Sequence, residues 1–189
     1  MDKLCKGYLF LVRTGFFLIP SCHYVDMMDC RYRFSREVDM GYIMALDQGT
    51  TSSRAFIYDE SFRVIAISQK PVGVCYPENG WVEQNPEEIW DSIVTVGREV
   101  IAKARIDSSQ IDAIGITNQR ETSLLWNKYS GEPIYNAIVW QDRRTADFCN
   151  TVLAHHEETI REKTGLVVDP YFSSTKLRWL LDYSKQNGL

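Results

Sequence analysis

The sequence lacks the signatures of several common classes of enzyme and binding protein. It has no Gly-x4-Gly-Lys-Ser/Thr phosphate loop, no Gly-x-Gly-x-x-Gly dinucleotide fingerprint, no Gly-x-Ser-x-Gly elbow and no His-Glu-x-x-His zinc motif. Its formal net charge of −4 gives no basic footprint for nucleic acid, so no nucleic-acid partner is expected. The five cysteines are scattered without a Cys-x-x-Cys pair, which favours neither a zinc site nor a disulfide scaffold and indicates a reducing, cytoplasmic setting.

Long hydrophobic runs are also missing. The apolar run from Tyr8 to Ile19 is interrupted by Arg13 and Thr14, and it is shorter than the roughly 20 residues that a membrane span needs. No membrane span is therefore expected. We interpret residues 1–40 as a poorly ordered extension or a mis-assigned start, with a targeting role as the alternative, and residues 41–189 as the folded domain.

What is present is a composition typical of globular proteins, with 44% hydrophobic and 24% charged residues over 189 positions. Apolar runs separated by turn residues predict a meander of three strands. Asn85 before Pro86 predicts a helix start, followed by an apolar face at helical spacing. The strands are predicted over 42–46, 54–58, 63–68, 111–117 and 122–126, with an apolar, extended segment over 134–140. Helices are predicted from Pro86 and over 142–155, 157–163 and 173–186. This order predicts an α/β domain with a mixed sheet flanked by helices.

The strongest local feature is the segment from Asp47 to Arg54, which reads Asp-Gln-Gly-Thr-Thr-Ser-Ser-Arg. A carboxylate ends a buried strand, and a glycine turn, hydroxyl residues and an arginine follow. Backbone N–H groups and hydroxyls in such a turn bind phosphate, and a carboxylate there suits Mg²⁺ in phosphoryl transfer. An ordinary hairpin turn has a similar composition, so both interpretations stay open on spacing alone.

Several segments together resemble the glycerol kinases, a group within the FGGY carbohydrate kinases. The resemblance covers nearly all of residues 42–189 and does not extend to residues 1–40. The blocks that carry it, in family order, are Ala45–Arg54, Gly80–Gln84, Ile114–Thr122, Ala137–Thr145 and Thr164–Ser173.

The resemblance implies a fold and a reaction. The fold would be an actin-like, ribonuclease-H-like domain whose sheet opens in a three-stranded meander, followed in the family by a second lobe across a cleft. The reaction would move the γ-phosphoryl group of ATP to glycerol with Mg²⁺, giving sn-glycerol 3-phosphate and ADP. Homo-oligomers of the full-length enzyme are left open.

The resemblance also implies roles for individual residues. The nucleotide-phosphate contacts are Thr50, Thr51, Ser52 and Arg54, and Asp47 is the metal residue. Arg120, Glu121 and Tyr171 match the glycerol contacts, and Trp140 matches an aromatic wall of the same pocket. Glycerol offers only hydroxyl groups, and charge-assisted hydrogen bonds to hydroxyls are the strong kind. Taken singly, the arginine and glutamate could equally be a surface pair, and the tyrosine a core residue.

The sequence departs from the family pattern in one respect. The family's catalytic base is an aspartate of a Gly-Asp-Gln segment in the second lobe, and these 189 residues contain no such segment. No catalytic residue is therefore expected within 41–189, and the chain alone is expected to be inactive. The alternatives are a non-catalytic truncated form that binds glycerol or a full-length subunit, and a piece of another FGGY sugar kinase.

Overall fold

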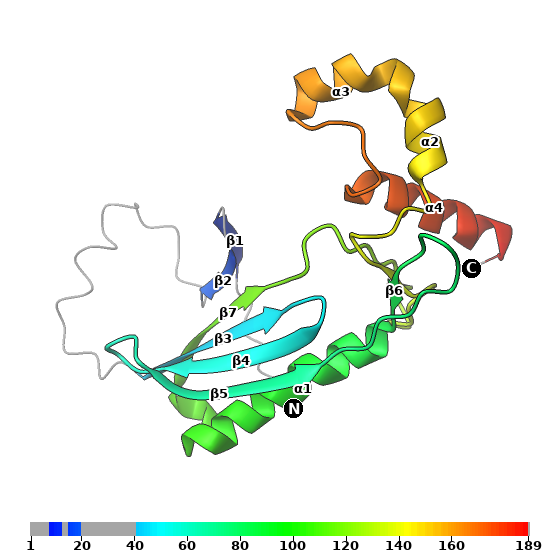
Figure 1. The fold of residues 1–189 in the computed structure, drawn as a ribbon. Coiled ribbons are helices and arrows are strands. Elements are labelled where there is room, and N and C mark those ends of the chain that lie inside the picture. The colour runs from blue at the N-terminus through cyan, green and yellow to red at the C-terminus, as the bar shows by residue number, and fades with distance from the viewer. Residues whose placement is uncertain (1–7, 13–14, 20–40, 189) are drawn as a thin grey trace. The chain divides into compact units, whose positions relative to one another are not determined.

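The computed structural model describes residues 8–12, 15–19 and 41–188 (Figure 1). They form two compact units, each made of two stretches of chain. Of the described residues, unit 1 comprises those up to residue 71 together with residues 92–118, and unit 2 comprises residues 72–91 together with those from residue 119 onward. The interpretation of residues 1–40 as an extension falls largely outside the described residues and stays a prediction.

Unit 1 contains a mixed sheet in the order β1-β2-β7-β3-β4-β5. Strands β3 and β7 are parallel, and every other neighbouring pair is antiparallel. The strands are β1 (Tyr8–Val12), β2 (Gly15–Ile19), β3 (Tyr42–Gln48), β4 (Ser52–Tyr58), β5 (Val64–Pro71) and β7 (Ile111–Thr117). The predicted mixed sheet and its three-stranded meander, β3 to β5, are confirmed.

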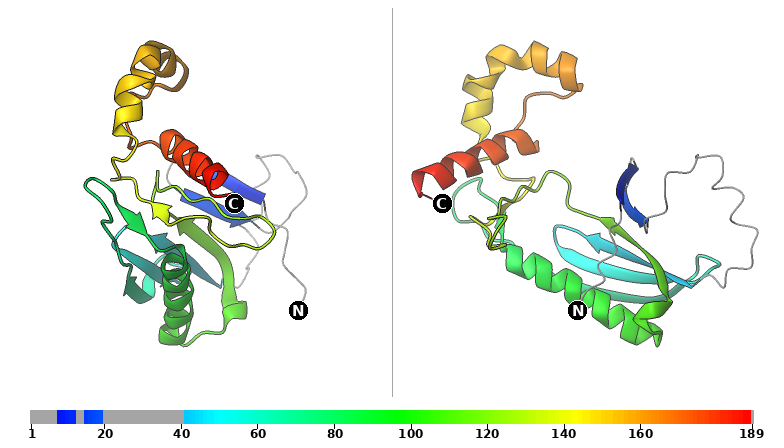
Figure 2. Two further views of the ribbon diagram at one scale, coloured as in Figure 1. Left: turned by 90° about the vertical axis from the view of Figure 1, so that its right-hand side faces the viewer. Right: turned by 180° about the vertical axis from the view of Figure 1, so that it is seen from behind.

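One helix, α1 (Pro86–Ala104), covers one face of this sheet (Figure 2). Its start is the predicted one, because the Asn85 side-chain oxygen accepts a hydrogen bond of 2.8 Å from the N–H of Glu87. Val96 and Val100 of α1 pack on Met44 and on its strand neighbours to form the core. The apolar spacing of this helix therefore predicts its buried face correctly.

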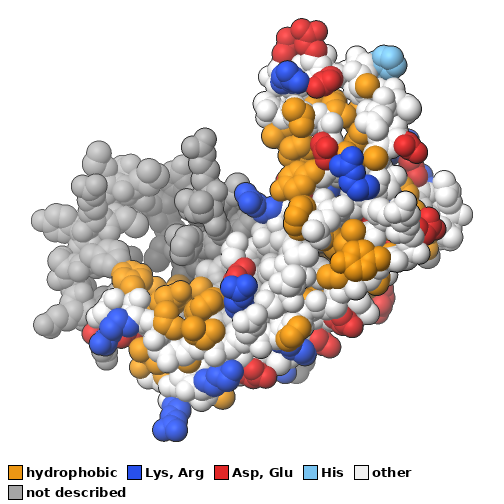
Figure 3. Space-filling model, viewed as in Figure 1, with side chains coloured by type: hydrophobic (Ala, Val, Ile, Leu, Met, Phe, Trp, Pro, Cys, Tyr) orange, Lys and Arg blue, Asp and Glu red, His pale blue; other side chains and the backbone are white. Residues whose placement is uncertain are grey.

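The opposite face of the meander carries apolar side chains that the described residues leave partly open. Ile67 of β5 pairs with Phe56 of β4 and is 50% exposed, whereas Ile57, one residue along β4 from Phe56, is 0% exposed. Successive strand residues point to opposite faces, which accounts for the contrast. Figure 3 shows hydrophobic side chains gathered over β3, β4 and β5.

Unit 2 has little regular sheet, and helices and loops make up most of it. Its two-stranded sheet pairs β6 (Glu83–Gln84) with β8 (Ala137–Ile138) in antiparallel fashion. Its helices are α2 (Ala146–Thr151), α3 (Glu157–Thr164) and α4 (Ser173–Gln186), with 3₁₀ turns at Leu153–His156 in this unit and at Ser108–Gln110 in unit 1. Gly165 ends α3 in the left-handed region at φ 73°, as predicted for a C-terminal glycine.

Two predicted elements of unit 2 are wrong in extent. The strand predicted over 122–126 is reduced to isolated bridges at Ser123 and Trp126. The helix predicted over 142–155 begins at residue 146, because the Asp142 carboxylate accepts the N–H of Arg144 and holds residues 142–144 in a turn.

In the part of the chain that the structure describes, no helix is both long and apolar enough to cross a membrane.

Replacing Ile57 by alanine is predicted to lower the free energy of unfolding by about 2–5 kcal/mol, because it opens a cavity in the core. Ile67→Ala on the neighbouring strand removes the same atoms from a half-exposed site. It should change the free energy of unfolding by no more than about 0.5 kcal/mol. Urea unfolding of the two variants measures both values. Equal losses would contradict the assignment of the two faces.

Candidate functional site

The predicted phosphate-binding residues lie in unit 1, at the hairpin between β3 and β4. Asp47 of β3 is directly opposite Arg54 of β4. Their side chains form a long ion pair of 4.0 Å and stay accessible, at 38% and 46% exposure. An exposed ion pair of this length contributes little to stability, so a ligand can replace it at little cost. Both charged groups are also exposed enough for a ligand to reach them.

The turn itself is tight and polar. The N–H of Gly49 donates to the carbonyl of Ser52 at 3.0 Å, which closes the hairpin. A Cβ at Gly49 would lie 3.1 Å from that carbonyl oxygen, so a side chain would crowd the turn. Thr51 at its tip is exposed and Thr50 is half-buried. The turn therefore presents backbone and hydroxyl groups at the end of the sheet.

Ser52 lies deeper than the prediction implied. It is 4% exposed, and its hydroxyl accepts a hydrogen bond of 3.0 Å from the side-chain amide of Gln69 on β5. A serine hydroxyl that accepts one bond retains a hydrogen to donate. The neighbouring Ser53 hydroxyl pairs with that of Ser92 on α1 at 2.7 Å, so Ser53 serves the hairpin's packing.

Asp47 stands at the carboxyl end of two parallel strands, since it pairs with Thr117, the last residue of β7. This edge is where open α/β sheets bind ligands. The described residues contain no group of three or more metal-binding side chains. Mg²⁺ that binds nucleotide phosphates needs only one or two carboxylates, with phosphate oxygens and water as further ligands. A single aspartate therefore fits such an ion.

The predicted glycerol contacts lie in unit 2. Arg120 and Glu121 form a turn after β7 ends at Thr117. Adjacent residues of a strand point to opposite faces, so both side chains can reach one ligand only because the strand has ended before them. Glu121 adopts φ 65°, a region that few non-glycine residues occupy. Its carboxylate accepts bonds from the N–H and the hydroxyl of Ser173, at 2.8 and 2.7 Å, at the start of α4. A carboxylate is favoured at a helix N-terminus, and this contact supports the unusual backbone.

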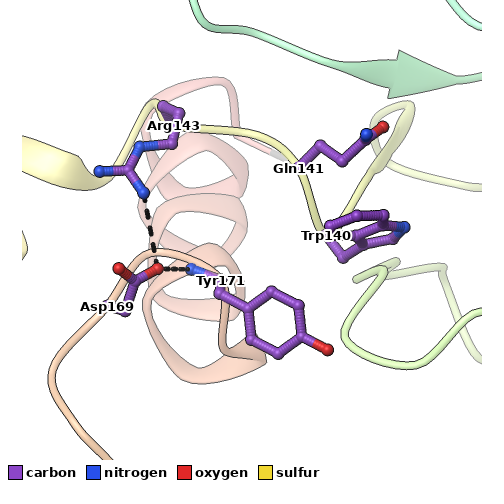
Figure 4. Close-up of a pocket in the computed structure, with 5 residues that line it drawn as sticks. All are labelled: Trp140, Gln141, Arg143, Asp169 and Tyr171. Atoms are coloured by element: carbon purple, nitrogen blue, oxygen red, sulfur yellow. Dashed lines mark hydrogen bonds and ion pairs between the residues drawn. The ribbon is translucent and has the colours of Figure 1, made fainter.

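A pocket of about 260 Å³ lies in the same unit (Figure 4). The rings of Trp140 and Tyr171 meet edge to face with centroids 5.9 Å apart. On the other side the Arg143 guanidinium lies 3.6 Å from a carboxylate oxygen of Asp169, and the same oxygen accepts the N–H of Tyr171 at 2.8 Å. The pocket is lined by Trp140, Gln141, Arg143, Asp169 and Tyr171.

The structure thus brings two of the four predicted glycerol residues into one pocket. Tyr171 and Trp140 line it, while Arg120 and Glu121 do not. Glu121 is tied to Ser173, two residues beyond Tyr171, and Arg120 is exposed. Arg143 and Asp169 were not singled out from the sequence. Both lie within blocks of the family resemblance, which is the signal that could have marked them.

A buried arginine holds the interior of unit 2. The side chain of Arg144 is 0% exposed and donates to Asp142 through Nε and Nη2, both at 2.9 Å, and to Glu83 through Nη2 at 2.6 Å. Its guanidinium carbon lies 3.8 Å from the Trp81 ring centroid and 4.5 Å from that of Trp179. Nη1 has no hydrogen-bond partner. The guanidinium to which it belongs is packed among aromatic rings, whose faces attract a cation.

This burial alters the acid–base properties of its neighbours. Burial alone would lower the pKa of Arg144, but hydrogen bonds to Asp142 and Glu83 outweigh it and raise the pKa above its ordinary value. Burial, reinforced by a hydrogen bond to Glu83, raises the pKa of Tyr135. Arg144 therefore stays charged and the Tyr135 hydroxyl stays protonated at neutral pH.

The family of the chain follows from these features and from sequence comparison. Residues 42–187 match the N-terminal domain of the FGGY family of carbohydrate kinases. The chain belongs to this family, and the matched range contains the hairpin of unit 1 and the pocket of unit 2.

The similar curated proteins are glycerol kinases. The chain is 58% identical over 145 residues to the glycerol kinase of Haemophilus influenzae and 54% identical over 145 residues to that of Cereibacter sphaeroides. Each match covers 76% of this chain and 29% of the relative. The chain thus spans less than a third of the length of the curated relatives that it matches.

Solved structures of the family share the fold. The crystal structure of Plasmodium falciparum glycerol kinase with ADP gives a TM-score of 0.70 at 32% identity, covering 79% of this chain and 31% of that one. A ligand-bound xylulose kinase from Lactobacillus acidophilus gives 0.68 at 25% identity, covering 77% and 29%. These matches confirm the predicted α/β fold of an FGGY N-terminal domain.

Replacing Arg144 by methionine is predicted to lower the free energy of unfolding by about 3–5 kcal/mol, because Glu83 and Asp142 would stay buried without their cation. The adjacent Arg143→Met is the control. Its side chain is 56% exposed and its ion pair is long, so the loss should be at most about 1 kcal/mol. Chemical unfolding monitored by near-ultraviolet circular dichroism measures both, and a tolerant Arg144→Met variant would refute the role of the network.

Proposed function

We propose that this chain forms the N-terminal region of a cytoplasmic, ATP-dependent glycerol kinase. The observation that carries the proposal is that the chain is 53–58% identical to several glycerol kinases over about 145 residues, or 76% of its length. Free thiols at Cys75 and Cys149 are compatible with a reducing compartment.

Unit 2 provides the groups that would recognise glycerol. Trp140 would lie against its carbon chain, and the Tyr171 hydroxyl would bond one of its oxygens. Arg120 would donate to glycerol oxygens, and Glu121 would accept from glycerol hydroxyls, through charge-assisted bonds. Since the Glu121 carboxylate already accepts two bonds from Ser173 and has about four lone-pair sites, it retains capacity for a ligand.

Unit 1 provides the groups that would hold the nucleotide phosphates. The hydroxyls of Thr50, Thr51 and Ser52 and the turn's N–H groups would donate to phosphate oxygens, and Arg54 would add a fixed positive charge. Asp47 would hold Mg²⁺, which neutralises charge on the phosphates when it is bound. In the transfer, the bond from the γ-phosphorus to the bridging oxygen would break as a glycerol oxygen bonds to that phosphorus, and the proton of the attacking hydroxyl would pass to a base that these 189 residues do not supply. The products are ADP and glycerol 3-phosphate.

Binding can be tested on the chain itself. Glycerol is predicted to shift the indole resonance of Trp140 and the ring resonances of Tyr171 in a saturable way. Glu121→Gln should weaken the affinity by about ten- to a hundredfold, since it replaces a charge-assisted acceptor with a neutral amide. An NMR titration measures both effects.

Glu132→Gln is the matched control, because Glu132 is exposed in a loop of the same unit, just after the turn at residues 128–130. Its affinity should equal that of the unaltered chain. Xylulose is titrated in parallel, since xylulose kinases share the fold. Saturable shifts with xylulose and none with glycerol would favour another FGGY sugar kinase, and no shift with either would contradict the assignment of the pocket.

The 189 residues alone are predicted to transfer no phosphoryl group. They contain no Gly-Asp-Gln segment and match only 29% of the length of their relatives, while phosphoryl transfer depends on complete positioning around the reacting groups. A coupled assay of ADP release with glycerol and ATP measures this, with a full-length glycerol kinase as the positive control. Glycerol-dependent turnover that Arg120→Ala abolishes would overturn the prediction.

A further inference from the structure

Lys176 has a position that the roles assigned above do not explain. Counting backbone and side chain together, it is the largest of the fully buried residues in the described part of the chain, at 0% exposure. Its ammonium donates to three consecutive backbone carbonyls, those of Pro170 at 3.0 Å, Tyr171 at 2.5 Å and Phe172 at 3.0 Å. All three N–H donors of the ammonium are thereby used. Lysine is almost never fully buried unless its charge is paired, and here three carbonyl oxygens satisfy the donors.

The location of Lys176 on α4 explains how it reaches these carbonyls. It is the fourth residue of the helix, and long helical side chains lean toward the N-terminus of their helix. The side chain therefore extends back over the first turn to the segment that enters the helix. A methionine of similar length could fill the same space without bringing a charge into the interior, so packing alone does not account for the lysine.

The residues entering α4 are held on their N–H side as well. The Asp169 carboxylate accepts the N–H of Tyr171 at 2.8 Å, and the Glu121 carboxylate accepts the N–H of Ser173 at 2.8 Å. Lys176 supplies the only cation bonded to the carbonyls of this segment in the described part of unit 2. Backbone N–H and carbonyl groups at Tyr171 and at the residues before and after it are thus held by hydrogen bonds to side chains.

Residues 170–172 include part of the lining of the pocket. Tyr171 lines the pocket and meets Trp140 edge to face. A rotation of the peptide at residues 170–172 would move the ring away from the indole. We propose that Lys176 is a positioning residue, whose ammonium fixes these three carbonyls and so holds the Tyr171 ring at the pocket.

The pKa of Lys176 is lowered from its ordinary value, because burial outweighs the negative charges of Glu121, Asp142 and Asp169 that favour the charged form. The three hydrogen bonds of the side chain, and not this shift, carry the proposal. The expected effect of Lys176 on glycerol affinity rests on the proposed function. The expected effect of Lys176 on the position of the Tyr171 ring does not.

The test uses the whole chain with two readouts, and the variant is Lys176→Met. The first readout is the nuclear Overhauser effect between the rings of Tyr171 and Trp140, which needs no ligand. The second is glycerol affinity. We expect the variant to lose the ring contact and to bind glycerol about tenfold more weakly, the equivalent of one hydrogen bond. Lys185→Met, an exposed lysine on the same helix, should change neither.

A double-mutant cycle separates positioning from general loss of stability. If Lys176 acts through the tyrosine, Tyr171→Phe should weaken glycerol binding in the unaltered chain and have little further effect in Lys176→Met. Additive losses would overturn the proposal. So would an unchanged ring contact in Lys176→Met.

A measurement on the unaltered chain decides the matter if Lys176→Met does not fold. With ¹⁵N-labelled lysine, the Lys176 ammonium should exchange its hydrogens slowly and show couplings across hydrogen bonds to the carbonyl carbons of residues 170–172. Rapid exchange without such couplings would refute the proposal. An intact ammonium and ring contact in a chain that binds no glycerol would instead uphold the role of Lys176 and contradict the proposed function.

Discussion

The charge of one buried guanidinium is the constraint on which unit 2 depends. This unit has only two short strands, so a backbone ladder cannot organise it. Arg144 instead joins Glu83 on β6, its own loop through Asp142, and the Trp179 ring on α4. Breaking a buried ion pair is costly because the remaining charge stays in the interior. The arginine therefore fixes which segments, distant in sequence, become neighbours. Three of the four residues that directly precede it in the chain line the pocket.

The two groups of predicted site residues arise from different kinds of structure. The hairpin from Asp47 to Arg54 is local, since a glycine turn and a register of six residue pairs between β3 and β4 place all its groups. The pocket is non-local, because Trp140 and Tyr171 are 31 positions apart and meet through the segments that Arg144 and Lys176 hold. Local sites depend on turn chemistry, whereas non-local sites depend on the packing of the whole unit.

That difference explains what the sequence could predict. The strands of the meander, the strand Ile111–Thr117, the start of α1 and helix α4 were predicted because each has its own periodicity or cap. The strand over 122–126 and the start of the helix over 142–155 were predicted wrongly, because the side chains of Thr122 and Asp142 bond to nearby groups in turns. The family resemblance marked Tyr171 and Trp140. Lys176 carried no signal, since its partners are backbone carbonyls, and the importance of Arg144 depends on Glu83, 61 positions away.

The interleaved course of the chain has a consequence for synthesis on the ribosome. Residues 72–91, which belong to unit 2, are made before the second stretch of unit 1. Unit 1 is complete once residue 118 has emerged, while residues 72–91 must wait for the stretch of unit 2 that begins at residue 119 and brings Arg144 to Glu83. During that interval Glu83 has no cation beside it. Folding during translation therefore favours unit 1 first, and a pause after residue 118 would leave its sheet formed and the pocket unmade.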